Sequence, residues 1–525
     1  MPCQIRRYTC QLRTLLGVYR GQSDNFAGIE PVAEWAWLRR WLVLAVEDGV
    51  VAREFRRVDR DTPMLLPPDL RDWLPDDHLA WLVIEVVGAC DLSGMEASFR
   101  LGGAGRQAYD PQMMTALLVY GYCQGVRSSR AIERACVTDV AFRVVAAQQR
   151  PDHSTLSRFR QDQASGLADL FGQVLMVCAR QGMGRVGVVA IDGARIAANA
   201  SPQRSYLPKT LRRLAAEIVA EAGEVDAAED AEFGADVNGD ELPAGLAPGA
   251  DRQARIREAL RQAEAEEQSR READVEAAEV RLERARAAQQ RARDRAADRV
   301  PPGGDRGLTP ADELAAVRRV DARAARAADA ARKAGAGQGR RASLPGPRRN
   351  VTDPDSRLMS SRGKGYLQGF NAQLVVSDDH LIIATEVTNQ PADRGQFVPM
   401  MRQALDSAAT HLDGASVDLV LADAGYCSNE ALTAAGPDRL IATGRDPAKR
   451  GRSRPIAAMA ERLTDPHPDR KRYRRRAATV EPVIGMVKDR VGLRRFSRRG
   501  LQAARDELKL AATAYNILRL ATLTA

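Results

Sequence analysis

Two short, β-branched apolar runs, each followed directly by an aspartate, limit what this chain can fold into. VGVVAI ends before Asp192, and VDLVLA ends before Asp423. Runs of this kind suit strands that are buried on both faces, as in a mixed sheet covered by helices. Because strand ends in such a sheet converge on one rim, we expect the two carboxylates to lie together, although more than two hundred residues separate them.

Further strands and helices are predicted after these runs. GFNAQLVVS and HLIIATEVT flank Asp378 and Asp379 and indicate an antiparallel hairpin, and LIAT from Leu440 indicates another strand. A short helix is expected at residues 429–435. In the C-terminal segment, apolar residues at helical spacing mark one helix face against a core: Leu508, Ala511, Ala512, Tyr515 and Leu518.

The chain before the first run has a helical pattern from Pro67 to Gly182. Polar residues that can cap a helix open three segments, and glycine or proline closes them. The caps are Asp110, Ser128 or Ser129, and Asp152 or Ser154, and the stops are Gly125, Pro151 and Gly182. This pattern predicts a compact all-helical domain of four or more helices.

A segment rich in Ala, Arg and Glu, from about residue 202 to 349, interrupts the predicted sheet. ADVEAAEVRLERARAAQQRARDRAADR favours a helix by propensity but has few large apolar residues. Residues 301–304 (PPGG) break it, and a second helix is expected from Ala311 to about Ala334. A basic stretch, GAGQGRRASLPGPRRN, follows. We interpret the segment as an inserted helical arm with disordered ends that projects from the core.

A third carboxylate, Glu481, is placed on a helix expected to start near Thr479, with Pro482 in its first turn. Three carboxylates brought together repel one another, and a divalent cation relieves the repulsion. Hard oxygen ligands suit Mg²⁺ or Mn²⁺. Two such ions can activate an attacking oxygen and stabilise a leaving oxygen, which is the chemistry that phosphodiester cleavage and strand transfer require.

Basic residues follow Glu481 closely. Lys488 lies two helical turns later on the same face, where its ammonium can hold a phosphate as a point charge. Five arginines come next: Arg490, Arg494, Arg495, Arg498 and Arg499. Residues 469–500 contain twelve Lys or Arg against three Asp or Glu. Basic contacts of this kind supply sequence-independent affinity for the DNA backbone.

Each of these residues also has an ordinary structural interpretation. An aspartate after a strand is usually a turn residue or a helix cap. A glutamate in a first helical turn is favoured there by the helix dipole. A run of arginines can be a solvated surface. The wider motif context is what favours the functional interpretation.

Composition restricts the class of protein. A length of 525 residues indicates two to four domains, and the net charge of +9 agrees with a polyanionic partner. The seven cysteines include no Cys-x-x-Cys pair, which argues against a disulfide framework or a zinc site. No run reaches the roughly 20 apolar residues that span a bilayer. We therefore expect a soluble cytoplasmic protein without a membrane partner.

Five phrases in order resemble bacterial insertion-sequence transposases with an InsH-like N-terminal domain and an interrupted ribonuclease H-like core. They are LLPPDLRDWLPDDHLAWLV with YDPQMMTALLVYGYCQGVRSSRAIERAC and RPDHSTLSRFR; VGVVAIDGARIAANAS; NVTDPDSRLMSSRGKGYLQGFNAQLVV with ATEVTNQPADRGQFVPM; LADAGYCS; and VEPVIGMVKDRVGLRRFSRRGL with TAYNILRL. Apart from the first 55 or so residues and the arm, the resemblance covers nearly the whole chain.

The resemblance implies a catalytic Asp, Asp, Glu triad, matched here by Asp192, Asp423 and Glu481, and two Mg²⁺ or Mn²⁺ ions held by it. Glu481 and Lys488 match the family's Glu-x₆-Lys spacing. A Tyr and an Arg typically precede the Glu, and Tyr473 and Arg476 are the nearest candidates, with one residue more than usual between Arg476 and Glu481. The implied fold is α/β, with a five-stranded mixed sheet flanked by helices.

The same resemblance implies a domain plan and a partner. Residues 1–55 are an atypical N-terminal extension, 56–183 an end-binding helical domain, 184–204 with 350–525 the catalytic domain, and 205–349 the insertion. The partner is double-stranded DNA, both the terminal inverted repeats and the target. A homodimer on DNA and a nucleoid-associated location are expected.

Two other functions stay open. The chain can be a ribonuclease H-like nuclease or resolvase that lacks strand transfer. It can also be a DNA-binding remnant without chemistry. Joining of a cut end to a second duplex distinguishes a transposase from the nuclease, and metal-dependent nicking distinguishes both from the remnant.

Overall fold

The computed structural model describes residues 69–99, 107–218, 220, 250–297, 310–339, 346–361, 365–444 and 453–524. The chain divides into two compact units, Met1–Arg56 with Ala97–Ala108, and Arg57–Glu96 with Tyr109–Ala525. Nearly all described residues belong to the second unit. The predicted N-terminal extension lies outside the described residues, and so do residues 340–345 of the basic stretch. The prediction of disordered ends of the arm is wrong where the chain is described, because residues 205–206 and 349–350 pair as strands.

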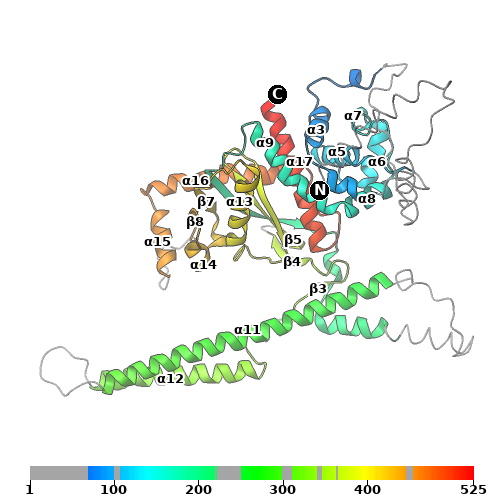
Figure 1. The fold of residues 1–525 in the computed structure, drawn as a ribbon. Coiled ribbons are helices and arrows are strands. Elements are labelled where there is room, and N and C mark those ends of the chain that lie inside the picture. Colours follow the sequence, from blue (N-terminus) through cyan, green and yellow to red (C-terminus); the bar gives the residue numbers. More distant parts are fainter. Residues whose placement is uncertain are drawn as a thin grey trace, which may run out of the picture. The chain divides into compact units, whose positions relative to one another are not determined.

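The N-terminal part of the second unit is helical, as predicted (Figure 1). Asp110 caps one helix through a hydrogen bond from the Met113 amide, and Asp152 caps another through the Thr155 amide. The predicted stops Gly125 and Gly182 have positive φ. The elements are η2 (Arg71–Trp73), α3 (Leu79–Gly88), α4 (Ser93–Ala97), α5 (Pro111–Cys123), α6 (Ser129–Thr138), α7 (Val140–Val145), α8 (His153–Asp162) and α9 (Ala164–Arg180).

Two of the three predicted segments are each broken once. Asp139 ends α6 and caps α7, where its carboxylate accepts hydrogen bonds from two backbone amides. Gln163 has a non-helical ψ of 22° and separates α8 from α9. α6 and α7 both pack against α5, which is buried along almost its whole length, whereas α8 packs against α6 and α9 packs against α17.

A six-stranded mixed sheet forms the centre of the second half of the chain. Its order is β4-β5-β1-β7-β8, and β6 pairs with β5. The strands are β1 (Val188–Ala197), β4 (Arg357–Ser361), β5 (Gly365–Ser377), β6 (Ile382–Thr388), β7 (Leu419–Ala422) and β8 (Asp438–Ile441). The predicted β5–β6 hairpin is confirmed. One strand more than expected is present because the 13-residue β5 extends beyond β6 and pairs there with β4.

Helices and short turns complete this part of the fold. α13 (Phe397–His411) packs against β5 and β6, and α16 (Pro468–Asp489) packs against β1, β5 and β7. α14 (Asn429–Thr433) and α15 (Arg454–Arg462) pack against each other. Two 3₁₀ turns, η3 (Pro202–Arg204) and η4 (Ala424–Tyr426), follow β1 and β7.

The C-terminal helix α17 (Leu501–Thr524) is buried on more than one face. It packs against β6 and also against α5 and α9, so that it joins the sheet to the N-terminal helices. The expectation of a single buried face is therefore wrong. Thr513 and Asn516 are fully buried beside the predicted apolar positions, and Leu518 is only half-buried. The Asn516 side chain accepts from the Ile382 amide and donates to the Ile382 carbonyl, which makes its burial possible.

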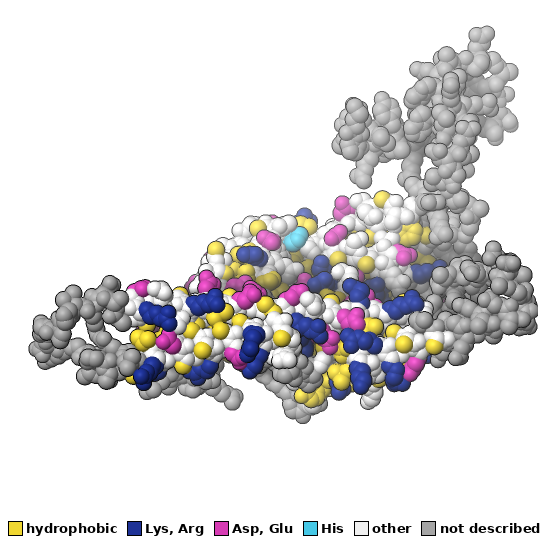
Figure 2. Space-filling model, turned by 90° about the horizontal axis from the view of Figure 1, so that it is seen from below, with side chains coloured by type: hydrophobic (Ala, Val, Ile, Leu, Met, Phe, Trp, Pro, Cys, Tyr) yellow, Lys and Arg dark blue, Asp and Glu magenta, His cyan; other side chains and the backbone are white. Residues whose placement is uncertain are grey.

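The Ala/Arg-rich segment forms two long helices, α11 (Ala250–Ala297) and α12 (Pro310–Gly335), which pack side by side (Figure 1). Figure 2 shows a face on which Lys and Arg side chains alternate with Asp, Glu and apolar side chains. β2 (Ser205–Tyr206) and β3 (Arg349–Asn350) pair where the segment leaves and rejoins the chain around the sheet. A small apolar cluster of Leu211, Ala259 and Ala263 packs beside them.

Candidate active site

Asp192 and Asp423 lie on neighbouring strands. β1 and β7 are parallel, and their last paired residues are Ile191 and Ala422, so the two aspartates come next in register. The sequence suggested that Asp192 ends its strand. This is wrong, because β1 continues to Ala197 against β5. The site therefore lies just past the last paired residue of β7, where β1 has no paired strand on that side.

Asp192 is mostly buried, and other carboxylates lie near it. Burial raises the pKa of its carboxyl above the usual value, and the negative charges of Asp423 and Asp393 raise it further. The Arg476 guanidinium and a hydrogen bond from the Gly193 amide act in the opposite direction. The site thus concentrates negative charge in a poorly solvated place, which is the condition that a bound cation relieves.

Asp393 is a further carboxylate of this site to which the sequence analysis assigned no role. It lies in the loop between β6 and α13, and its Oδ1 accepts from Asn371 Nδ2 at 2.8 Å and from Gln373 Nε2 at 2.9 Å. The Tyr426 hydroxyl donates to Gln373 Oε1 and fixes that amide. The available signal was an aspartate in the phrase ATEVTNQPADRG, five residues after a strand of the predicted hairpin.

Two glycines leave room for these carboxylates. A Cβ added at Gly193 would lie 2.6 Å from Asp393 Oδ1. A Cβ added at Gly425 would lie 3.0 Å from Asp423 Oδ1 and 3.1 Å from Asp393 Oδ2. Both positions follow an aspartate of the site in the sequence, so the phrases AIDG and LADAG each combine a carboxylate with the space that the neighbouring carboxylate needs.

Glu481 reaches the site through an arginine. Arg476 Nη2 lies 2.8 Å from Asp192 Oδ2, and Arg476 Nη1 lies 3.8 Å from Glu481 Oε1. The extra residue between Arg476 and Glu481 therefore does not keep the guanidinium away from either carboxylate. The Glu481 side chain is 64% exposed, so most of it faces solvent.

The prediction that a helix starts near Thr479 is wrong. α16 begins at Pro468, and Pro482 stands inside it rather than in its first turn. An internal proline has no N–H and leaves the carbonyl four residues earlier without its helical partner. That carbonyl belongs to Ala478, and His380 Nε2 lies 3.0 Å from it. The β5–β6 turn thus supports the helix three residues before Glu481.

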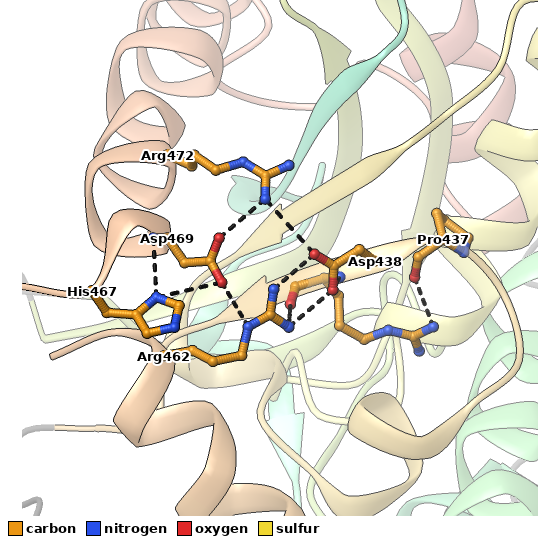
Figure 3. A network of polar contacts seen from close by, with 7 residues as sticks. Pro437, Asp438, Arg462, His467, Asp469 and Arg472 are labelled. Carbon is orange, nitrogen blue, oxygen red and sulfur yellow. Dashed lines mark hydrogen bonds and ion pairs between the residues drawn. The ribbon is translucent and has the colours of Figure 1, made fainter.

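A network of charged side chains holds the start of α16 beside β8 (Figure 3). Arg462 of α15 lies 2.7 Å from both Asp438 Oδ2 and Asp469 Oδ2, and Arg472 Nη1 lies 3.0 Å from Asp469 Oδ1. The hydrogen bond from Arg462 lowers the pKa of Asp438. Burial raises the pKa of Asp469, but the bonds from Arg462 and Arg472 outweigh it and lower the pKa.

Tyr473 and Lys488 both lie in the field of the aspartates. Burial raises the pKa of Tyr473, and the charges of Asp423 and Asp192 raise it further. Burial and then Arg494 lower the pKa of Lys488, while Asp192 raises it. Together with Arg476, these side chains of α16 place hydrogen-bond donors beside the carboxylates.

The remaining predicted basic residues do not form one group. Arg494 forms an ion pair with Asp489, and Arg498 lies 3.7 Å from Asp506. Arg490 is 3.4 Å from the Gln124 side chain of the N-terminal helices. Only Arg495 and Arg499 line a common hollow, which is lined also by residues that follow β1.

The expected close convergence of the three carboxylates is not seen. In the described part of the chain, no three His, Cys, Asp or Glu side chains lie close enough together to hold a metal ion. Arg476, between Asp192 and Glu481, supplies the positive charge there. The available donors are nevertheless carboxylate oxygens whose mutual repulsion is visible at Asp192. Such hard, anionic donors fit Mg²⁺ or Mn²⁺.

Two family models match the chain. A Transposase domain (DUF772) matches residues 68–162, and a Transposase DDE domain matches residues 320–517. Neither a comparison with curated proteins nor one with solved structures finds a match. The two matches lie in this order along the chain and agree with its fold. They define a transposase. The chain belongs to the insertion-sequence DDE transposases that carry this N-terminal domain.

The match to the DDE domain begins within α12 and leaves out β1 with Asp192. The strand order nevertheless places β1 between β5 and β7, inside the sheet of the matched domain. The family implies DNA as partner and polynucleotidyl transfer as the general activity. Among the described residues, no helix is long and apolar enough to cross a membrane.

Proposed function

We propose that this transposase cleaves DNA at the terminal inverted repeats of its element and joins the cut ends to target DNA in a metal-dependent reaction. The observation that supports this most is the placement of Asp192 and Asp423 in register on β1 and β7, with Asp393 beside them. Arg476 and Glu481 approach the same place from α16. This grouping argues against a DNA-binding remnant without chemistry, and the two family matches favour a transposase over a nuclease.

In this proposal Asp192, Asp423 and Glu481 hold two Mg²⁺ or Mn²⁺ ions. Bound divalent ions activate the attacking oxygen and stabilise the leaving oxygen of a phosphodiester. Asp393, held by the Asn371 and Gln373 amides, adds a further negative charge beside Asp192 that the cations would offset. Lys488, Tyr473 and Arg476 contact the phosphate that enters, with Lys488 as a point charge and Arg476 as a planar donor.

The chain order suggests how DNA reaches the site. We propose that residues 56–183 bind the element ends, that 184–204 with 350–525 form the catalytic domain, and that 205–349 form the insertion. α17 packs against both the N-terminal helices and β6, so a duplex held by the first domain is fixed relative to the sheet. The described residues of each chain include one such group of carboxylates, and an element has two ends. A homodimer on DNA follows from that count.

The test uses a labelled duplex that contains one element end, with Mg²⁺ and an unlabelled target duplex. The wild-type protein should nick the end and join it to the target. Asp423→Asn keeps the shape of the side chain and removes its charge, so it should abolish both products while DNA affinity stays nearly unchanged. The double change Arg494→Ala with Arg495→Ala should weaken DNA binding and leave the chemistry on bound DNA nearly unchanged.

Three outcomes separate the candidate functions. Nicking without joining identifies a nuclease or resolvase. Binding without nicking identifies a remnant. If Asp423→Asn nicks at the wild-type rate, Asp423 holds no catalytic ion and the proposed mechanism fails, whatever the family match.

A further inference from the structure

A hollow of about 580 Å³ lies beside the segment that follows β1. Nine residues line it, and four of them are arginines from three distant parts of the chain: Asn199, Ala200, Ser201, Pro202, Arg204, Arg255, Thr352, Arg495 and Arg499. No carboxylate is among these lining residues. Four guanidinium groups around one space repel one another, and an anion in that space would remove the repulsion.

The C-terminal side of the hollow is held by backbone contacts. Ala197 and Arg495 form a β-bridge, and Arg495 Nη1 donates to the Ala198 carbonyl at 3.3 Å. Arg499 Nε donates to the Asn199 carbonyl at 3.3 Å, and Asn199 Nδ2 donates to the Ser497 carbonyl at 2.8 Å. These bonds fix where the guanidinium groups point.

The opposite side belongs to the insertion. Arg255 lies on the second turn of α11, and the base of α11 is anchored by the ion pair between Arg349 and Glu266. Gln262 of the same helix donates to Asp355 Oδ1 at 2.8 Å. The Arg204 carbonyl accepts from the Val351 amide at 3.0 Å, which ties this residue to the same base. Hydrogen bonds therefore hold both sides of the hollow to the rest of the fold.

The charge of the hollow is local. α11 as a whole has twelve Arg against eleven Asp or Glu, so the helix carries little net charge. Attraction to a polyanion along α11 in general is therefore weak, whereas four arginines meet at this one place. A guanidinium is planar and has five donors, which suits phosphate oxygens.

We propose that this hollow binds a backbone phosphate of the duplex DNA on which the transposase acts, at a position distinct from the cleavage site. The inference rests on the proposed function and adds the base of the insertion to the DNA-binding surface. Ala197 follows Asp192 by five residues on β1, a separation of roughly 17 Å at the rise of a strand. That length corresponds to about five base pairs of duplex.

The experiment compares two double variants with the same loss of charge. Arg204→Ala with Arg255→Ala removes half of the hollow's arginines, and Arg252→Ala with Arg257→Ala removes two exposed arginines of α11 that do not line it. Affinity for an end-containing duplex is measured by fluorescence anisotropy at several salt concentrations. Circular dichroism of each variant shows that it is folded.

Two lost phosphate contacts should lower the slope of log K against log salt by about 2 and weaken binding roughly 60-fold at about 0.1 M salt. The control variant should match the wild type. With a duplex that ends about three base pairs from the cleavage point, the hollow variant and the wild type should bind equally.

Unchanged slope in the hollow variant, or equal losses in both variants, would overturn the proposal. The same holds if the short and long duplexes show the same loss, because the effect would then not depend on DNA that reaches the hollow. Nicking by the wild-type protein is scored separately, so failure of the hollow leaves the proposed activity intact.

Discussion

Glu507 is a buried carboxylate whose removal should destabilise the protein strongly. Its side chain is fully buried, and Arg127 Nη1 lies 2.6 Å from its Oε1. The Ser497 amide and hydroxyl also donate to it, at 2.8 and 2.9 Å. Glu507→Leu would leave the largely buried Arg127 charge uncompensated, which costs about 3–5 kcal/mol in the free energy of unfolding.

Urea unfolding followed by circular dichroism measures this loss. Asp489→Ala is the matched control, because Asp489 also pairs with an arginine of this segment but is 63% exposed, and such pairs contribute about 0–1 kcal/mol. Arg127→Met combined with Glu507→Leu removes both charges and should cost less than the sum of the single changes. A loss below about 1 kcal/mol for Glu507→Leu, or strict additivity, would refute this account of the buried pair.

Arg462→Met should lower the free energy of unfolding at neutral pH. Because Arg462 lowers the pKa of both aspartate partners below 3.8, the stability that they contribute is complete above 3.8 and is lost as the pH falls further, so the difference from the wild type should shrink there. A pH-independent difference in urea unfolding would contradict this. His380→Ala should lower the free energy of unfolding by about 1 kcal/mol and slow nicking, without changing DNA affinity. Neither effect should appear in a Pro482→Ala background, because the new N–H can donate to the Ala478 carbonyl. Equal effects in both backgrounds would exclude this role. Gly193→Ala should abolish nicking because its Cβ would lie 2.6 Å from a site carboxylate, whereas Gly187→Ala, with its nearest atom at 3.4 Å, should nick normally.

Much of the local structure could be read from the sequence. The caps at Asp110 and Asp152, the β5–β6 hairpin and the strand before Asp423 follow from short-range chemistry, namely side-chain bonds to nearby amides and alternation of apolar residues. The placement of Asp192 and Asp423 at the ends of neighbouring paired segments was also predictable, because both follow apolar runs of the kind that a buried sheet requires. The beginning of α16 was not, since Pro482 suggested a first turn.

What the sequence by itself determined is the list of elements and the residue types available to the site. Only the tertiary structure decided that β1 continues past Asp192, because the continuation depends on β5, a strand more than 150 residues away. It alone placed Asp393 beside Asp192, and joined Arg204 and Arg255 to Arg495 and Arg499. These groupings depend on contacts between distant segments, and periodicity and spacing report only on neighbours along the chain.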